Sequence, residues 1–95
     1  MEYKILQVKD FRSCNYMFVD YDSAVGYGFN LDDYEVIYEG DIEMSESIED
    51  TLENLFYIFN VMHPEGFTGH SLSVSDVVYL DGDYYYVDSF GYKKL

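Results

Sequence analysis

The sequence predicts a small α+β domain: an antiparallel sheet with a C-terminal β-hairpin, and one main helix, at about residues 48–61, packed on one face. Three features indicate this fold. The first residues alternate in polarity, an amphipathic segment follows a good N-cap near the middle, and an Asp-Gly pair joins two strand-like runs near the end. With 95 residues, 48% apolar and 20% aromatic, the chain is long enough for a single domain, 1–95, and too short for two.

Two strands are expected in the first half of the chain. The segment 2–8 alternates, so that Tyr3, Ile5 and Gln7 share one face of a strand. The segment 34–38 consists mainly of β-branched and aromatic residues, and Gly40-Asp41 is expected to end this second strand.

The segment between these strands carries weaker signals. Asp10 is expected to cap a short helical turn over Phe11–Phe18, although the aromatic residues make this turn a weak one. Val19–Asp33 is rich in Asp, Gly and aromatic residues, and is expected to form an irregular loop.

The strongest helix signal covers Ile48–Val61. Ser47 is a good N-cap, and Asp50 at the third helical position forms an approximate capping box with it. His63-Pro64 ends the helix, because the residue before a proline avoids the helical region. Apolar residues recur at the spacing of one helix face: Ile48, Leu52, Leu55, Phe56 and Phe59.

A hairpin is expected near the C-terminus. The strand-like segments 76–80 and 84–89 flank Asp81-Gly82-Asp83, and Asp-Gly is a strong turn signal. The consecutive tyrosines 84–86 must alternate between the two faces of their strand, so some of them lie at the surface or in a second packing layer.

The charge distribution limits the classes of partner. The net charge is −14, and no Lys or Arg occurs between Ser13 and Tyr92, where 17 acids lie. Direct nucleic-acid binding and anionic membrane surfaces are disfavoured, because both need basic groups. A basic partner is favoured, and its association should be fast and sensitive to salt. The alternative is that the acids only keep the protein soluble.

No metal site is expected. The pairs Asp20/Asp22 and Asp81/Asp83 resemble fragments of a calcium loop, but neither completes the spacing of an EF-hand. His63 and His70 lie too far apart for a helical zinc pair.

No cofactor and no enzymatic activity are expected either. A phosphate-binding glycine loop is absent. The serines near His70 lie in an alternating segment without a nucleophile elbow, and Cys14 is more simply a small, partly buried residue. The single cysteine, the lack of a signal peptide and the lack of a long apolar segment favour a cytoplasmic protein.

A polar run precedes the hairpin. We expect its side chains to form a hydrogen-bond network that fixes the entry to the hairpin, since such segments usually satisfy nearby backbone groups. The alternative is a loop that contacts a partner. The residues concerned are His70, Ser71, Ser73, Ser75 and Asp76.

The last part of the chain resembles the YodL-like domain family of bacteria. The resemblance rests on His63-Pro64, on GHSLSVSDVV at 69–78 and on YYVDSFGY at 85–92, with Tyr92 in place of the usual Phe. The strand at 34–40 and the helix at 52–60 also look like those of the family. Such domains are common on mobile elements, often beside antirestriction-type genes, and have no established catalytic activity. The resemblance therefore implies a non-enzymatic accessory protein.

Two functions are compatible with these features. The first is an acidic inhibitor that binds a basic, nucleic-acid-binding protein, such as a restriction or CRISPR effector, by mimicking nucleic acid. The second is a general interaction module that uses exposed tyrosines and the His70 loop. The acids expected to contact the partner in the first case are Asp32, Asp33, Glu43, Glu46, Glu49, Asp50 and Glu53.

Overall fold

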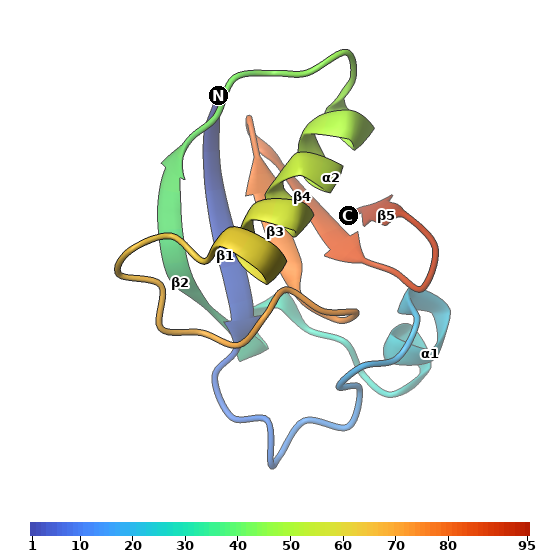
Figure 1. Cartoon of the computed structure of the whole chain (residues 1–95). Coiled ribbons are helices and arrows are strands. Elements are labelled where there is room, and N and C mark those ends of the chain that lie inside the picture. The colour runs from blue at the N-terminus through green and yellow to red at the C-terminus, as the bar shows by residue number, and fades with distance from the viewer.

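A computed structural model describes all residues, 1–95, and places five strands in one antiparallel sheet (Figure 1). The order of the strands across the sheet is β2-β1-β3-β4-β5, so the N-terminal strand lies near the centre and β2 and β5 form the edges. This arrangement confirms the predicted α+β class. The strands are β1 Glu2–Val8, β2 Tyr34–Asp41, β3 Val77–Leu80, β4 Asp83–Val87 and β5 Tyr92–Lys94.

Helix α2, Ile48–Tyr57, lies across one face of the sheet (Figure 1). Its N-cap is the predicted one, because Ser47 Oγ accepts a hydrogen bond of 3.1 Å from the Asp50 backbone N–H. The chain continues through a π-helical turn, Ile58–Met62, and leaves it at His63, whose φ of +30° ends the helix before Pro64. The predicted helix is therefore confirmed, with its end one residue later.

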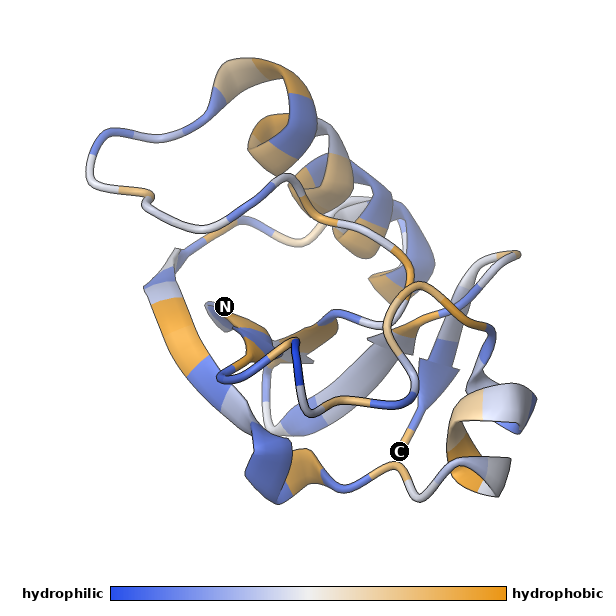
Figure 2. Ribbon diagram, turned by 90° about the horizontal axis from the view of Figure 1, so that it is seen from below, coloured by the Kyte–Doolittle hydropathy of each residue, from blue (hydrophilic) through white to orange (hydrophobic).

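The first core lies between α2 and the sheet. Apolar and hydrophilic residues alternate around the helix (Figure 2), and the apolar ones face the strands. Register places Ile5 opposite Val78, so that central strand residues meet the helix. The buried members of this core are Tyr3, Ile5, Leu52, Leu55, Phe59, Leu72, Val78, Leu80, Tyr85 and Val87.

A second core covers the opposite face of the sheet, so that both faces are packed. The segment between β1 and β2 folds beneath the sheet and supplies Tyr16 and Ala24 to it. Aromatic rings meet edge to face there, with the Phe29 and Tyr86 centroids 5.5 Å apart. Its buried members are Leu6, Tyr16, Ala24, Tyr34, Val77 and Tyr86.

The structure corrects both expectations for the segment between β1 and β2. Residues 11–18 form no helix, because the Asp10 carboxylate accepts from the Arg12 N–H and the Ser13 hydroxyl in a local turn. Residues 19–33 are not wholly irregular. They contain helix α1, Tyr21–Gly26, capped by Asp20, and a 3-10 turn, Leu31–Asp33.

The strand boundaries also differ from those expected. β2 continues to Asp41 instead of ending at Tyr38, since Gly40 and Asp41 remain paired with β1. β5 has no counterpart in the prediction, and it forms because the turn at Gly91, with φ of +74°, returns the chain along β4.

Candidate functional site

The seven acids expected to bind a partner fall into two groups. Asp32 and Asp33 precede β2, whereas Glu43 and Glu46 follow its other end (Figure 1). A strand of this length spans about 23 Å, so the two groups cannot meet in one small patch. Glu49, Asp50 and Glu53 lie on α2, and all seven side chains are exposed.

Strand β2 itself connects these groups through three exposed acids that the sequence analysis did not single out: Glu35, Glu39 and Asp41. Because β2 is an edge strand, side chains on both of its faces reach solvent beside the free edge. We call the following residues the β2 rim: Asp32, Asp33, Glu35, Glu39, Asp41, Glu43 and Glu46.

Two acids of α2 are partly engaged within the protein. Glu53 lies beside the Tyr92 hydroxyl, whose pKa is raised by burial and then by the Glu53 charge and hydrogen bond. Glu49 reaches the turn at Gly91, where its Oε1 would lie 3.9 Å from an added Cβ. Glu53 therefore also contacts β5, whereas Asp50 is exposed.

The surface acids have almost no basic partners. Lys94 Nζ lies 3.4 Å from Asp83 Oδ2, and this is the only pair between a carboxylate and a lysine or arginine. Lys4 instead lies over the Tyr79 ring, 5.1 Å from its centroid. The carboxylates of the β2 rim are therefore not neutralised within the chain.

The polar run before the hairpin surrounds one buried carboxylate, that of Asp76, which is 1% exposed. Its Oδ2 accepts from the Ser73 N–H at 2.8 Å and from the Gln7 side-chain amide at 3.1 Å. The same Gln7 amide donates to the His70 carbonyl at 2.8 Å, and Gln7 Oε1 accepts from the His70 N–H at 3.2 Å. We call Gln7, His70, Ser73 and Asp76 the Asp76 network. Gln7 was placed on the correct strand face, but no local signal indicated its partners.

The pKa of the Asp76 carboxyl is raised to about 7 because it is buried. The Ser73 hydrogen bond, the charge of His70 and the Gln7 hydrogen bond each lower it, but burial outweighs them. The buried Asp76 carboxyl therefore holds its proton more tightly than an exposed aspartate does.

The His70 ring is held by the protein on both sides. Its Nδ1 lies 2.7 Å from the Ser71 carbonyl oxygen, which can only accept, so Nδ1 carries a proton. Gln7 Nε2 lies 3.2 Å from the same nitrogen, but two donors form no hydrogen bond with each other. The other nitrogen, Nε2, faces Asp76 Oδ1 at 3.7 Å. This geometry fixes the loop and directs neither nitrogen to a neighbouring nucleophile.

Ser75 connects two more segments of the chain to the region around Asp76 by hydrogen bonds. Its backbone has a φ of +84°, its Oγ accepts from the Phe18 N–H at 3.0 Å, and its carbonyl accepts from the Tyr34 hydroxyl. Ser71 lies at the edge, with Oγ 3.5 Å from His63 Nε2. The polar run thus connects the loop after β1, the start of β2 and the entry to β3.

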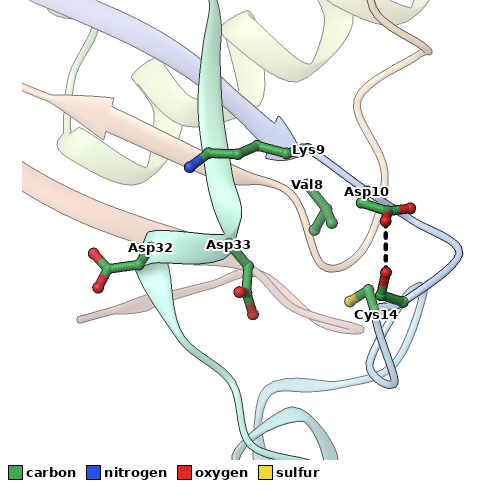
Figure 3. A pocket seen from close by; sticks show the side chains of 7 residues that line it. Val8, Lys9, Asp10, Cys14, Asp32 and Asp33 are labelled. Atoms are coloured by element: carbon green, nitrogen blue, oxygen red, sulfur yellow. Dashed lines mark hydrogen bonds between the residues drawn. The ribbon is translucent and has the colours of Figure 1, made fainter.

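Two hollows adjoin this region and share Val8. One, of about 290 Å³, is lined by Cys14 and by carboxylates of the loop after β1 and of the turn before β2 (Figure 3). Asp32 and Asp33 point in different directions there, and no group of three potential ligands could hold a metal ion. The second hollow, of about 360 Å³, is mainly apolar and is lined by Val8, Phe11, Met17, Phe18 and His70.

Tyrosines 84–86 alternate between the two faces of their strand, as expected, and two of the three are buried. Tyr85 belongs to the core under α2 and Tyr86 to the second core, where its hydroxyl donates to the Val19 carbonyl at 2.7 Å. Tyr84 is half-buried and packs against Tyr79, with the ring centroids 5.1 Å apart. The exposed aromatic side chains near His70 are those of Phe11 and Phe18 instead.

Comparison with protein families gives one match. The family described as YodL-like domain matches residues 2–95, which extends the resemblance noted above to the N-terminal strand and both cores. No curated protein and no solved structure gives a significant match. None of the helices is long and apolar enough to cross a membrane.

Proposed function

Because the chain belongs to the YodL-like domain family over residues 2–95, we propose for it a non-enzymatic role in which it binds and inhibits a basic, nucleic-acid-binding protein. The proposed partner is a bacterial defence protein, such as a restriction or CRISPR effector. The protein would act in the cytoplasm as an accessory of a mobile element or phage, and its carboxylates would take the place of phosphates.

The observation that carries this proposal is the lack of basic partners within the chain for the surface acids. Every carboxylate except that of Asp76 is at least partly exposed, and only Asp83 pairs with a lysine. Lysines and arginines of a partner would neutralise these charges and relieve their mutual repulsion. Such contacts speed association and make it dependent on salt.

Charge density indicates how much of the surface must take part. Strand β2 spans about 23 Å and carries three acids, whereas one DNA strand carries a charge per ~3.4 Å. The strand alone is therefore much less densely charged than DNA. Effective mimicry requires the acids that flank β2 and those at the start of α2, so we propose that the partner contacts both.

A second function is favoured by a different observation. Phe11 and Phe18 are exposed apolar side chains beside the His70 loop, and aromatic residues are common anchors of protein interfaces. In this alternative the chain is an interaction module for a neutral or mixed partner, and salt would have little effect on binding.

Capture from a bacterial lysate on the immobilised chain separates these functions. We expect basic proteins to be retained at low salt and released by a short DNA duplex at constant ionic strength, because duplex and protein compete for one site. We expect two double variants, Glu35→Lys/Glu39→Lys and Glu46→Lys/Asp50→Lys, each to reduce capture more than ten-fold. A ten-fold reduction corresponds to a loss of about 1.4 kcal/mol of binding free energy.

The matched control is Asp22→Lys/Glu65→Lys, which changes the net charge equally at exposed positions outside the β2 rim and α2. Capture by this control should equal that of the parent. Equal losses in all three variants would contradict a role for the rim. Capture that resists salt and DNA but is lost in Phe18→Asn would establish the interaction module instead.

A further inference from the structure

Strand β2 is an edge of the sheet, and no other strand lies along its outer side (Figure 1). Its residues pair only with β1, and none of the hydrogen bonds made in turns and loops uses the backbone of residues 35–41. The outer side of an edge strand presents N–H and C=O groups that a further strand can bond. The backbone of β2 can therefore accept an extended segment.

The register of β1 and β2 identifies the backbone groups on this free side. The Met1 amino group donates to the Ile42 carbonyl at 2.8 Å, and the Ile42 N–H donates to the Met1 carbonyl at 2.9 Å. Pairs that exchange hydrogen bonds alternate with pairs that do not along an antiparallel ladder. Gly40 therefore also bonds β1, whereas Glu39 and Asp41 direct their N–H and C=O groups away from it.

Acidic and apolar side chains alternate along the same stretch of chain. Glu39, Asp41 and Glu43 occupy every second position, and all three are exposed. Between them, Tyr38 and Ile42 pack against the core under α2. Strand residues rise about 3.4 Å each, so these acids are spaced by about 7 Å. Alternate side chains of any extended peptide have the same spacing, so a basic strand beside β2 can match the acids one to one.

The acidic face of this edge is not neutralised within the chain. Asp41 lies opposite Glu2 on β1, so two acids are neighbours there. Glu39 lies opposite Lys4, but the Lys4 ammonium lies over the Tyr79 ring and forms no ion pair. A second copy of this chain, with a net charge of −14 and the same acidic edge, would be repelled. The occupant whose charge fits this edge is a basic segment of a different chain.

We propose that the free edge of β2 binds an extended segment of the partner as an additional antiparallel strand, and that this segment carries lysine or arginine at every second position. Its basic side chains lie beside Glu39, Asp41 and Glu43, and its intervening apolar side chains lie beside Tyr38 and Ile42. This binding mode rests on the proposed function, because the segment belongs to the basic partner. Backbone hydrogen bonds fix its position along β2, and the charge pairs select its sequence.

A synthetic peptide, Gly-Lys-Val-Lys-Val-Lys-Gly with both ends blocked, is the probe, and its Kd is measured by NMR titration of the whole chain at low salt. In the free protein, the amide hydrogens of Glu39 and Asp41 should exchange faster than that of Gly40, and bound peptide should slow both. The rearranged peptide Gly-Lys-Lys-Val-Val-Lys-Gly has the same composition without the alternation. It should bind about ten-fold more weakly or worse.

Two methylated forms of the probe separate backbone pairing from attraction between charges. A peptide residue opposite Glu39 or Asp41 exchanges hydrogen bonds with it, so only the N–H groups of the lysines face β2. N-methylation of the middle lysine should weaken binding about ten-fold, because it removes a donor and crowds the contact. N-methylation of one valine should change the Kd less than about three-fold, since that N–H faces away from β2. Both forms carry the same charge.

Matched variants of the chain test the acids themselves. Glu39→Gln/Asp41→Asn keeps the shape of the edge and removes two charges, so it should bind the probe about ten-fold more weakly. Asp22→Asn/Glu65→Gln removes the same charge at exposed positions elsewhere, and its Kd should lie within about two-fold of the parent value.

The outcomes distinguish this binding mode from the proposed function. Equal affinity of the alternating and rearranged peptides, or equal effects of the two methyl groups, would overturn the additional strand and leave the basic partner of the proposed function in place. Binding of the probe as expected, together with failure of the capture from lysate, would support the additional strand and contradict the proposed function. Concentration-dependent protection of the Glu39 amide without peptide would show that a second copy occupies the edge, and would also overturn the proposal.

Discussion

Gln7 and Asp76 are 69 residues apart in the chain, yet the Gln7 amide donates a hydrogen bond of 3.1 Å to the buried Asp76 carboxylate. The antiparallel pairing of β1 with β3 brings them together. Leu6 lies opposite Val77, so Gln7, which follows Leu6, lies beside Asp76, which precedes Val77. The same amide holds the His70 carbonyl, so one side chain of the central sheet fixes the whole loop before the hairpin.

Replacing Gln7 by Leu should reduce the free energy of unfolding by about 1–3 kcal/mol, because Asp76 and the His70 backbone lose buried partners. Urea unfolding measures this change. Lys9→Ala, an exposed substitution just beyond the same strand, is the control and should alter stability by less than about 0.5 kcal/mol. Equal stability of Gln7→Leu and the parent would show that the network does not stabilise the fold.

The Asp76 carboxyl should make stability fall as pH rises from about 4 to about 7. In the unfolded chain its pKa is about 3.9, and burial raises it to about 7 in the fold, so the folded state binds the proton more tightly in this window. The contribution of Asp76 to the free energy of unfolding is complete below the pKa of the unfolded chain. It is lost as the pH rises through the pKa of the folded state. The titratable groups that face Asp76 are His70, Tyr34 and Tyr86.

Asp76→Asn isolates this effect, because an amide keeps an acceptor for the Ser73 N–H and cannot titrate. Thermal unfolding of parent and variant between pH 4 and pH 8 should show curves that diverge with rising pH, by on the order of a few kcal/mol at the upper end. If stability depends on pH in the same way in the parent and in Asp76→Asn, then Asp76 has the same proton affinity in the folded and the unfolded chain.

Local signals predicted the parts of the fold that depend on local interactions. Ser47 caps α2 because its hydroxyl bonds a backbone N–H three residues on, and Asp81-Gly82 forms a tight turn through its own backbone angles. Both are properties of a few consecutive residues. The acidic character of the surface was also visible, since it follows from composition.

The second core and the Asp76 network could not be predicted in this way. Tyr16 and Tyr86 pack in one cluster although 70 positions separate them, and they meet because the segment between β1 and β2 folds against the sheet. Gln7 looked like the polar end of a strand face, and its role depends on the loop folded over it. Asp20 was a detectable N-cap for α1, but the glycines and aromatics that follow obscured the helix.

Leu52→Ala should destabilise the protein by about 2–5 kcal/mol, since Leu52 is fully buried between α2 and the sheet and its removal leaves a cavity. Phe56 is only half-buried beside β5, so Phe56→Ala should have a smaller effect. Denaturant midpoints of the two variants provide the comparison. A larger loss of stability for Phe56→Ala than for Leu52→Ala would contradict the orientation of α2 in which Leu52 faces the sheet.

Gly69→Ala should destabilise the fold although it adds a single methyl group. An added Cβ would overlap with Ile37 Cδ1 and Gln7 Oε1, so both side chains would have to move. Overpacking of this kind costs about 1–3 kcal/mol. Gly26→Ala is the matched control, because no atom lies within 4 Å of its added Cβ and its φ is not positive.

The measurement for Gly69→Ala is thermal unfolding of the variant alone and combined with Gln7→Ala, which removes one of the two clashing groups. If the clash with Gln7 destabilises the variant, the loss of stability in the double variant should be smaller than the sum of the losses in the two single variants. Full additivity would show that the added methyl group acts on Ile37 alone.

Moderate salt should stabilise the isolated protein. Between Ser13 and Tyr92 the chain carries 17 acids and no lysine or arginine, and folding brings these charges closer together than in the expanded chain. Salt screens this repulsion over a Debye length of about 10 Å at 0.1 M. The opposing effect is small, since the Lys94–Asp83 pair is exposed and such pairs contribute about 0–1 kcal/mol.

The midpoint of thermal unfolding should therefore rise between low and moderate salt, and rise less in Glu35→Lys/Glu39→Lys, where two of the repelling charges are reversed. A midpoint that is flat or falls would mean that the few ion pairs of the terminal lysines outweigh the repulsion among the acids.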